Sequence, residues 1–147
     1  MCGLAAIYAY SGDAPPVNEA ALAACNARMI RRGPDAEGSW VSGDGRVGLA
    51  HRRLAIIDLD DRAAQPMSLT DGGPRIDITY NGEIYNFRAL RQQLQDQGQE
   101  FKTQSDTEVL LHLYRRDGAD MVRHLRGMFA FAIWDEEKRG MLLGRDA

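Results

Sequence analysis

The sequence predicts a single domain in which helices and strands pack as layers. Its 147 residues are 44% apolar, which is enough for one hydrophobic core rather than several small ones. Strand-like and helical segments alternate toward both ends of the chain, and we find no internal repeat, low-complexity tract or linker. Strands mixed with helices in this way are typical of layers that share a core.

The first two elements are a buried strand and an amphipathic helix. Residues 3–10 are apolar and precede turn residues at 11–13, which predicts the strand. Asn18 is suited to cap a helix over residues 19–30. Four residues share one face of that helix: Leu22, Cys25, Met29 and Ile30. We therefore expect Cys25 in the core.

The middle and end of the chain supply further strands and two more helices. Residues 47–58 and 76–80 have strand character and are separated by a polar stretch rich in turn residues. Asn86 is suited to cap a helix that reaches residue 97, and Ser105 or Asp106 to cap a helix over 108–116. Residues 128–135 and 141–145 are predicted strands around a charged turn at 136–139.

Charge and cysteine content narrow the class of function. Eighteen basic and 21 acidic residues give a net charge of -3, so no basic field is expected to bind nucleic acid or an anionic membrane. The run at 3–10 is too short to span a membrane and has no basic residues before it. With only Cys2 and Cys25 and no other sign of secretion, we expect reduced thiols and a cytoplasmic protein.

Cys2 is the first candidate for chemistry. Removal of the initiator methionine places its thiol beside a free α-amine, whose reference pKa of about 7.7 to 8.0 leaves far more free base near neutrality than a lysine at about 10.4. One residue then supplies both nucleophile and base. The alternative, on position alone, is that Cys2 is a small buried hydrophobic residue.

Asn81, Gly82 and Glu83 directly follow the strand predicted at 76–80. An Asn side-chain amide and an adjacent Gly N–H are able to donate to the same oxygen, as the oxyanion of acyl transfer requires. The alternative is a plain Asn-Gly hairpin turn.

Six short segments together resemble the glutaminase domain of asparagine synthetases, and the resemblance covers nearly the whole chain. In chain order they are Met1-Cys2-Gly3, Arg32-Gly33-Pro34-Asp35, His51-Arg52-Arg53-Leu54-Ala55-Ile56, Asn81-Gly82-Glu83-Ile84-Tyr85-Asn86, Ser105-Asp106-Thr107-Glu108 and Arg126-Gly127-Met128-Phe129-Ala130-Phe131-Ala132. The resemblance implies a class II glutamine amidotransferase. It also implies an α+β fold of the N-terminal nucleophile hydrolase type, a four-layer α/β/β/α sandwich with two antiparallel sheets.

The resemblance also implies roles for individual residues. Cys2 attacks the side-chain carbonyl of L-glutamine with its α-amine as base, and Asn81 and the Gly82 N–H hold the oxyanion. Arg53 binds the α-carboxylate, and Glu83 and Asp106 bind the α-ammonium group. These charges suit a zwitterion. The alternatives are a surface arginine, a strand-end carboxylate and a helix cap.

Arg32, Gly33, Pro34 and Asp35 resemble the family's loop that closes over bound glutamine, although the same residues are also suited to end a helix. The family usually has His where this chain has Arg31, which leaves open any contact of that imidazole. His51, His112 and His124 lack metal-ligand spacing, so we assign them no chemistry and expect no metal site.

The family continues beyond residue 147 into further strands and an ATP-using synthetase domain. We therefore expect residues 1–147 to be a glutaminase domain truncated at its C-terminal end, with the synthetase domain as its partner and a homodimer as one option. No phosphate-binding loop occurs in the sequence, so no cofactor is expected here, and ATP and Mg belong to the synthetase domain. The ammonia acceptor is aspartate in asparagine synthetases. The alternatives are an amidotransferase of polysaccharide or natural-product biosynthesis, or a catalytically silent module if Met1 is retained.

Overall fold

The computed structural model describes residues 2–54 and 61–147, in which the strands form two antiparallel sheets. The first sheet has the order β1-β3-β2, and the second has the order β4-β5-β6-β7. The strands of the first sheet are β1 (Gly3–Tyr8), β2 (Ala36–Val41) and β3 (Val47–Arg53). Those of the second are β4 (Met67–Leu69), β5 (Ile76–Ile84), β6 (Gly127–Asp135) and β7 (Gly140–Arg145).

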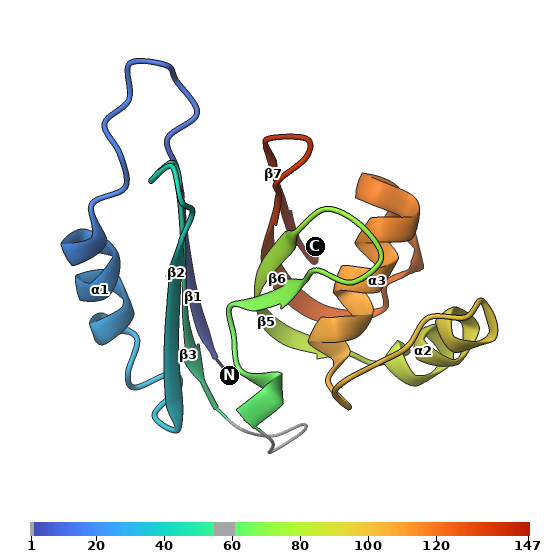
Figure 1. Cartoon of the computed structure of the whole chain (residues 1–147). Helices are drawn as coiled ribbons and strands as arrows, with labels where there is room; N and C mark the ends of the chain where they lie inside the picture. Colours follow the sequence, from blue (N-terminus) through green and yellow to red (C-terminus); the bar gives the residue numbers. More distant parts are fainter. Residues whose placement is uncertain (1, 55–60) are drawn as a thin grey trace.

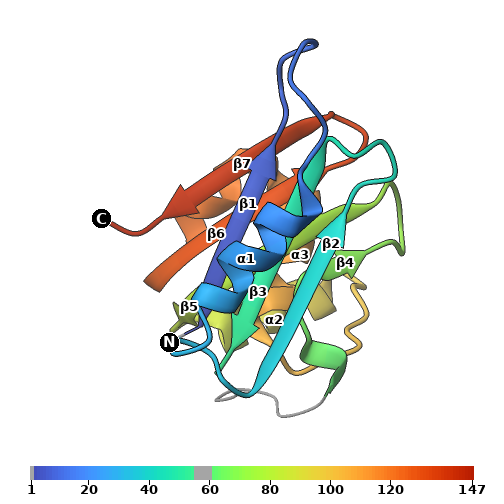
Figure 2. The same cartoon turned by 90° about the vertical axis from the view of Figure 1, so that its left-hand side faces the viewer.

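Helices cover the outer faces of the two sheets. Helix α1 (Glu19–Arg28) lies on the first sheet, and α2 (Phe87–Asp96) and α3 (Asp106–Asp117) lie on the second (Figures 1 and 2). Two short 3-10 helices, η1 (Asp61–Ala63) and η2 (Gly118–His124), connect other elements. The order of layers is helix, sheet, sheet, helix, which confirms the α/β/β/α prediction.

The hydrophobic core has two parts because the second sheet is covered on both faces. Between the sheets, Val47 and Leu49 of β3 pack with Ala132 and Trp134 of β6. The larger part fills the space between the second sheet and the helices, with Leu110, Leu111 and Leu113 of α3 fully buried. Helix α3 thereby fixes the position of β5, which carries several of the predicted site residues.

The N-terminal helix is confirmed, but it ends at Arg28, and the predictions that Cys25 and Ile30 lie on its buried face are wrong, since Ile30 is 51% exposed. Asn18 caps α1 by accepting a hydrogen bond from the Ala21 N–H at 3.0 Å. The buried residues are Leu22 and Asn26, with Met29 half-buried, whereas Cys25 is exposed and unpaired with Cys2. The helix packs along the line from Leu22 to Asn26, and Cys25 lies to one side of that line.

The strand predictions are confirmed in position and corrected in extent. Strand β1 is present, but only Gly3 in it is buried, because β1 is an edge strand paired with β3 alone. Strand β3 ends at Arg53, and residues 55–58 of its predicted range lie outside the described residues, as does Met1. Strand β2 has no counterpart among the predicted elements, since its sequence is half polar.

Helices α2 and α3 also follow the prediction. The side chain of Ser105, rather than Asp106, caps α3 by accepting from the Thr107 N–H at 3.0 Å. Asn86 precedes α2 without a capping bond from its side chain, which instead binds the backbone of His124 and Arg126.

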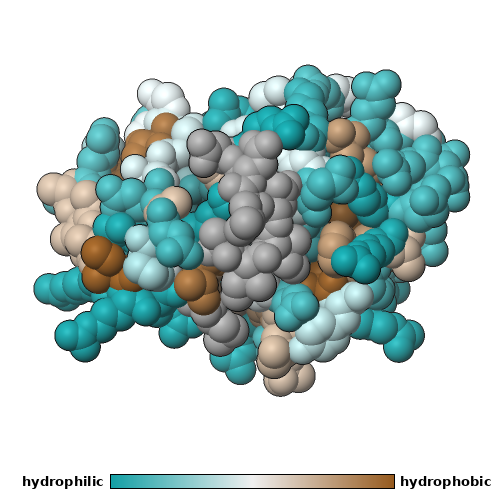
Figure 3. All heavy atoms as spheres, turned by 90° about the horizontal axis from the view of Figure 1, so that it is seen from below, coloured by the Kyte–Doolittle hydropathy of each residue, from teal (hydrophilic) through white to brown (hydrophobic). Residues whose placement is uncertain are grey.

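None of the helices in the described ranges is long and apolar enough to cross a membrane. Viewed from below, the described residues around the grey atoms form a mainly hydrophilic surface with small separate hydrophobic groups (Figure 3).

Candidate active site

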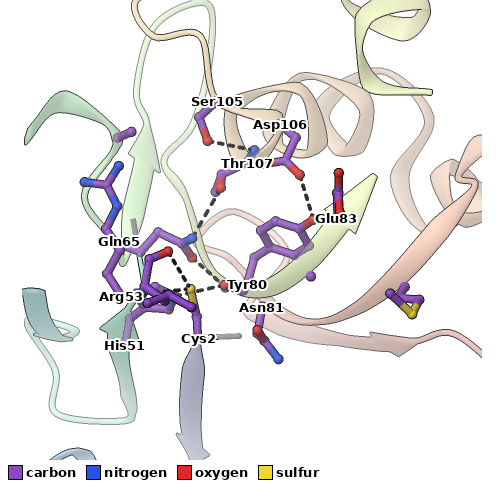
Figure 4. Close-up of a pocket in the computed structure, with 14 residues that line it drawn as sticks. Cys2, His51, Arg53, Gln65, Tyr80, Asn81, Glu83, Ser105, Asp106 and Thr107 are labelled. Carbon is purple, nitrogen blue, oxygen red and sulfur yellow. Dashed lines mark hydrogen bonds between the residues drawn. The ribbon is translucent and has the colours of Figure 1, made fainter. Parts of the chain in front are cut away.

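One cavity brings together all the residues predicted to act on substrate. Its volume is about 150 Å³, a size that suits one small metabolite rather than a polymer. The predicted residues that line it are Cys2, Arg53, Asn81, Gly82, Glu83 and Asp106, joined by others that include His51, Gln65, Tyr80 and Thr107 (Figure 4). These residues come from the segment before β1, from β3, β5 and β6, from the start of α3 and from the segments that join these elements.

Cys2 lies immediately before β1 and is held against the end of β3. Its Sγ accepts a hydrogen bond from the Leu54 N–H at 3.3 Å and lies 3.6 Å from the Leu54 carbonyl oxygen, to which the thiol donates. The side chain is only partly buried. Cys2 is therefore not a buried packing residue, and its sulfur borders the cavity.

The backbone of β5 explains how a strand exposes N–H groups to this cavity. Odd-numbered residues of β5 bond to β6, since the Arg75 carbonyl accepts from the Glu136 N–H and the Tyr85 N–H donates to the Arg126 carbonyl. The even-numbered residues of β5 therefore direct their N–H and C=O groups toward the edge of β5 that faces away from β6. Strand β4 covers that edge only opposite Ile76 to Ile78, so the edge beyond it faces the cavity.

Of the three N–H groups along this open edge, two are bound by side chains. The Tyr80 N–H donates to Gln65 Oε1 at 2.6 Å, and the Ile84 N–H donates to Asp106 Oδ2 at 3.3 Å. Gly82 lies between them and borders the cavity. Its partner on β6, Phe129, directs its own backbone groups away from β5 toward Asp146. The alternation of the strand therefore points the Gly82 N–H into the cavity.

Only glycine fits at position 82. Its φ of +154° is rarely adopted by residues with a side chain. A Cβ atom there would overlap the Met128 carbonyl oxygen and lie 2.6 Å from Phe129 Cα. Residues 81 and 82 lie inside β5 rather than at a turn, so the hairpin alternative is wrong.

The Asn81 side chain projects from one face of β5, whereas the Gly82 N–H lies along the edge of that strand. Thr79, two residues earlier, donates its hydroxyl to the Ala50 carbonyl of β3 at 3.0 Å, so this face of β5 is turned toward the first sheet. Asn81 therefore faces the sheet that carries Cys2. Asn81 and Gly82 thus supply two neighbouring potential donors to the cavity that Cys2 also lines.

Asp106 is the buried acid of the cavity. Its Oδ2 accepts from the Tyr80 hydroxyl at 2.7 Å as well as from the Ile84 N–H. Burial raises the pKa of the Asp106 carboxyl, and these hydrogen bonds only partly oppose that effect. Asp106 is the first residue of α3, where the helix dipole favours negative charge.

Arg53 and Glu83 differ in exposure. Arg53 is only 9% exposed, so the surface-arginine alternative is wrong. Glu83 is exposed and lies within β5, one residue before its end. The cavity thus carries one cationic and two acidic side chains on three different elements.

The loop of Arg32, Gly33, Pro34 and Asp35 does not line the cavity but lies against its wall. Arg32 Nε donates to the Cys2 carbonyl oxygen at 3.0 Å, and the Asp35 N–H donates to the Arg53 carbonyl oxygen at 3.0 Å. Gly33 packs so closely on β3 that a Cβ atom would lie 2.6 Å from the Arg53 nitrogen. The loop therefore contacts the backbone of two cavity residues.

Sequence reasoning missed several residues of the cavity wall. His51 is buried and its Nε2 donates to the Tyr80 carbonyl at 3.0 Å, and burial lowers its pKa to about 4, so the ring is neutral. Its position two residues before Arg53, on the same face of β3, was an available signal. Gln65 bridges the Tyr80 N–H and the Thr107 hydroxyl, and no local pattern marked it. Within residues 2–54 and 61–147, no three His, Cys, Asp or Glu side chains are grouped to hold a metal ion.

Comparisons with known proteins agree with this geometry. The sequence model of the family described as "Glutamine amidotransferase domain" matches residues 1–147. Glutamine-hydrolyzing asparagine synthetase 3 of Bacillus subtilis is 45% identical over 118 residues, which are 80% of this chain and 19% of that protein. Amidase chry2 of Gibberella zeae is 37% identical over 155 residues, covering 99% of this chain and 22% of that protein. The chain thus spans about a fifth of the length of these relatives.

A solved structure shares the fold. Glutamine phosphoribosylpyrophosphate amidotransferase from B. subtilis, complexed with ADP and GMP, superimposes with a TM-score of 0.59 and 30% sequence identity. The match covers 69% of this chain and 23% of that one. Together with the four layers, this likeness confirms the N-terminal nucleophile hydrolase fold.

Proposed function

The chain belongs to the glutamine amidotransferase domain family, and from this premise we propose that it hydrolyses L-glutamine to L-glutamate and ammonia. One observation carries the proposal. The Cys2 sulfur, the Asn81 amide, the Gly82 N–H and side chains of both charges border the same small cavity. That set matches what hydrolysis of an amide on a free amino acid requires.

The proposed chemistry begins once Met1 has been removed. The free α-amine of Cys2 takes the thiol proton, and Sγ attacks the side-chain carbonyl carbon of glutamine. The carbonyl oxygen becomes an oxyanion, to which Asn81 and the Gly82 N–H donate. The C–N bond then breaks, and the departing nitrogen takes the proton from the α-amine and leaves as ammonia. Water attacks the resulting thioester, releasing glutamate and restoring the thiol.

Specificity for glutamine comes from its charged end. Arg53 is assigned to the α-carboxylate, and Glu83 and Asp106 to the α-ammonium group. Arg53 rather than the adjacent Arg52 is assigned this role, because Arg53 lines the cavity. Arg52 lies on the other face of β3, where it contacts Glu37 and the Asn26 carbonyl. The loop from Arg32 to Asp35 is assigned the role of a cover, since it already contacts the backbone of Cys2 and Arg53.

The ammonia is proposed to serve a synthetase domain of the same protein. ATP and Mg would be required there and no cofactor in this domain, and aspartate is the first candidate acceptor, by likeness to asparagine synthetases. The second candidate is a related amidotransferase of polysaccharide or natural-product biosynthesis, because the relatives of this chain are not all asparagine synthetases and one of them is named amidase chry2.

The test is ammonia release from glutamine by protein whose intact mass shows that Met1 has been removed. Cys2→Ala is expected to abolish release with an unchanged circular dichroism spectrum. The matched control is Cys25→Ala, which removes the exposed cysteine of α1 and is expected to keep full activity. Release at the wild-type rate by the Cys2→Ala variant would refute the proposed nucleophile.

A further inference from the structure

The buried carboxylates of the second sheet and α3 differ in how their charge is balanced. Asp77 is fully buried and pairs with Arg75 at 2.8 Å, and Asp135 pairs with Lys138 at 3.2 Å. Glu108 accepts from the backbone N–H groups of Lys102 and Thr103 and lies 3.9 Å from His112. Asp106 is only 4% exposed, yet in the described part of the chain no basic side chain pairs with it. A buried anion without a cation is costly unless a ligand supplies one.

Tyr80 is the side chain that holds Asp106. It is 3% exposed and belongs to the core beneath α3, so its ring has little freedom to move. Its backbone is fixed as well, because the N–H donates to Gln65 and the carbonyl accepts from His51. The hydroxyl then reaches Asp106 Oδ2 at 2.7 Å (Figure 4). Tyr80 therefore connects the open edge of β5 to the first residue of α3.

The contact sets the orientation of the carboxylate. Both bonds to Asp106 from β5, the Tyr80 hydroxyl and the Ile84 N–H, use the same oxygen, Oδ2. Two donors on one oxygen fix the plane of the carboxylate and therefore the position of Oδ1. The bond from Tyr80 is the shorter of the two and joins a hydroxyl to an anion, the stronger class of hydrogen bond.

We propose that the Tyr80 hydroxyl is a positioning group that orients the Asp106 carboxylate to bind the α-ammonium group of glutamine. This inference rests on the proposed function and deepens it, because it names a determinant of selectivity for an amino acid over an amide without the α-amine. Tyr80 acts through Asp106 and needs no contact with the reacting carbonyl.

The charged and titratable groups around Asp106 support this assignment. Cys2 precedes β1, His51 and Arg53 come from β3, Tyr80 and Glu83 from β5, and all five line the same cavity. On α3 itself, Glu108 is turned to the 102–103 backbone. Burial raises the pKa of Asp106, and the Tyr80 bond works against that rise. Loss of the hydroxyl should therefore raise the Asp106 pKa further.

The experiment compares Tyr80→Phe with Tyr114→Phe. Tyr114 is a matched control, because it is 7% exposed and its hydroxyl donates to buried Asp135 at 3.0 Å, outside this cavity. Each protein is assayed with glutamine and with 4-carbamoylbutanoate, the same amide without the α-ammonium group. We expect Tyr80→Phe to lower the preference for glutamine, as a ratio of kcat/KM, roughly tenfold, and Tyr114→Phe to leave it unchanged.

A second measurement needs no substrate. The Asp106 side-chain carboxyl carbon, followed by NMR in protein labelled with ¹³C-aspartate, should titrate at higher pH in Tyr80→Phe than in the wild type. If Tyr80→Phe keeps the wild-type preference, or loses stability and activity just as Tyr114→Phe does, the inference about Tyr80 is wrong. If the wild type hydrolyses neither amide while the NMR shift is present, the proposed function fails and the contact between Tyr80 and Asp106 stands.

Discussion

The two ends of α3 contain the same buried pair, a tyrosine hydroxyl bound to an aspartate, in different surroundings. At the start of the helix Tyr80 donates to Asp106, and near its end Tyr114 donates to Asp135. Asp135 also receives the Lys138 N–H at 3.0 Å and lies 3.2 Å from Lys138 Nζ. Asp106 has hydrogen-bond donors but no cation within the described residues.

This difference separates a structural site from a binding site. Burial works to raise the pKa of Asp135, but its contacts with Lys138 and Tyr114 outweigh burial and lower the pKa below its ordinary value. For Asp106 burial prevails, and its pKa is raised. Of these two carboxylates, the one without a cation among the described residues is the one that lines the cavity with Cys2. The cavity therefore keeps the energetic cost of a buried carboxylate without a cation, a cost that Lys138 offsets at Asp135.

The largest expected effect is on turnover at the cavity end. Asn81→Ala removes one of the two donors proposed to bind the oxyanion and should lower kcat for glutamine about a hundredfold, with little change in thermal stability. The control is Asn18→Ala, which removes the cap of α1 and should cost about 1 kcal/mol of stability at normal kcat. Steady-state kinetics and thermal unfolding measure both. Near-normal kcat in Asn81→Ala would exclude Asn81 from the oxyanion site.

The effect of intermediate size is a change in the free energy of unfolding. Its sign should differ between variants at the two ends of α3. Asp106→Asn removes a buried charge without a cation and should raise the free energy of unfolding at pH 7 by about 1 kcal/mol while weakening glutamine binding. Asp135→Asn removes the partner of Lys138 and should lower the same quantity by about 1 kcal/mol. Urea denaturation of both variants provides the measurement. Equal destabilisation by the two would remove the distinction drawn between them.

The smallest expected effect is the pH dependence of the structural pair. Because the folded-state pKa of Asp135 is lowered, its contribution is present above the unfolded pKa of about 3.9 and is lost as pH falls through the folded value. Lys138→Met should cost about 0.5 to 1 kcal/mol at pH 7, since the Lys138 side chain is 60% exposed. The difference from the wild type should shrink below about pH 4. A constant difference from pH 7 to pH 3 would mean that Lys138 stabilises by packing alone.

Local signals in the sequence predicted much of the fold. The cap at Asn18, the cap at Ser105 and the charged turn before β7 each depend on neighbours in the chain. The six cavity residues were identified by likeness of motif, and all of them line one cavity. The resemblance to the glutaminase motifs was therefore sufficient to identify the group.

What the sequence did not reveal depends on contacts between distant segments. The face of α1 that packs on the first sheet is set by the sheet beneath it, so Cys25 was misplaced. The open edge of β5 exists because β4 is short, and Gln65 reaches it from a segment without regular structure. The bond from Tyr80 to Asp106 joins residues 26 positions apart, and no pattern within either segment indicates it.

The central claim is that the Cys2 thiol is the nucleophile of a site that recognises glutamine. Its most direct test is to treat Met1-processed protein with an electrophilic glutamine analogue and locate the adduct by mass spectrometry. Cys25 is an internal control, because it is the more exposed of the two cysteines. The account predicts a single adduct on Cys2 that excess glutamine prevents. Labelling of Cys25 alone, or labelling of Cys2 that glutamine does not slow, would contradict it.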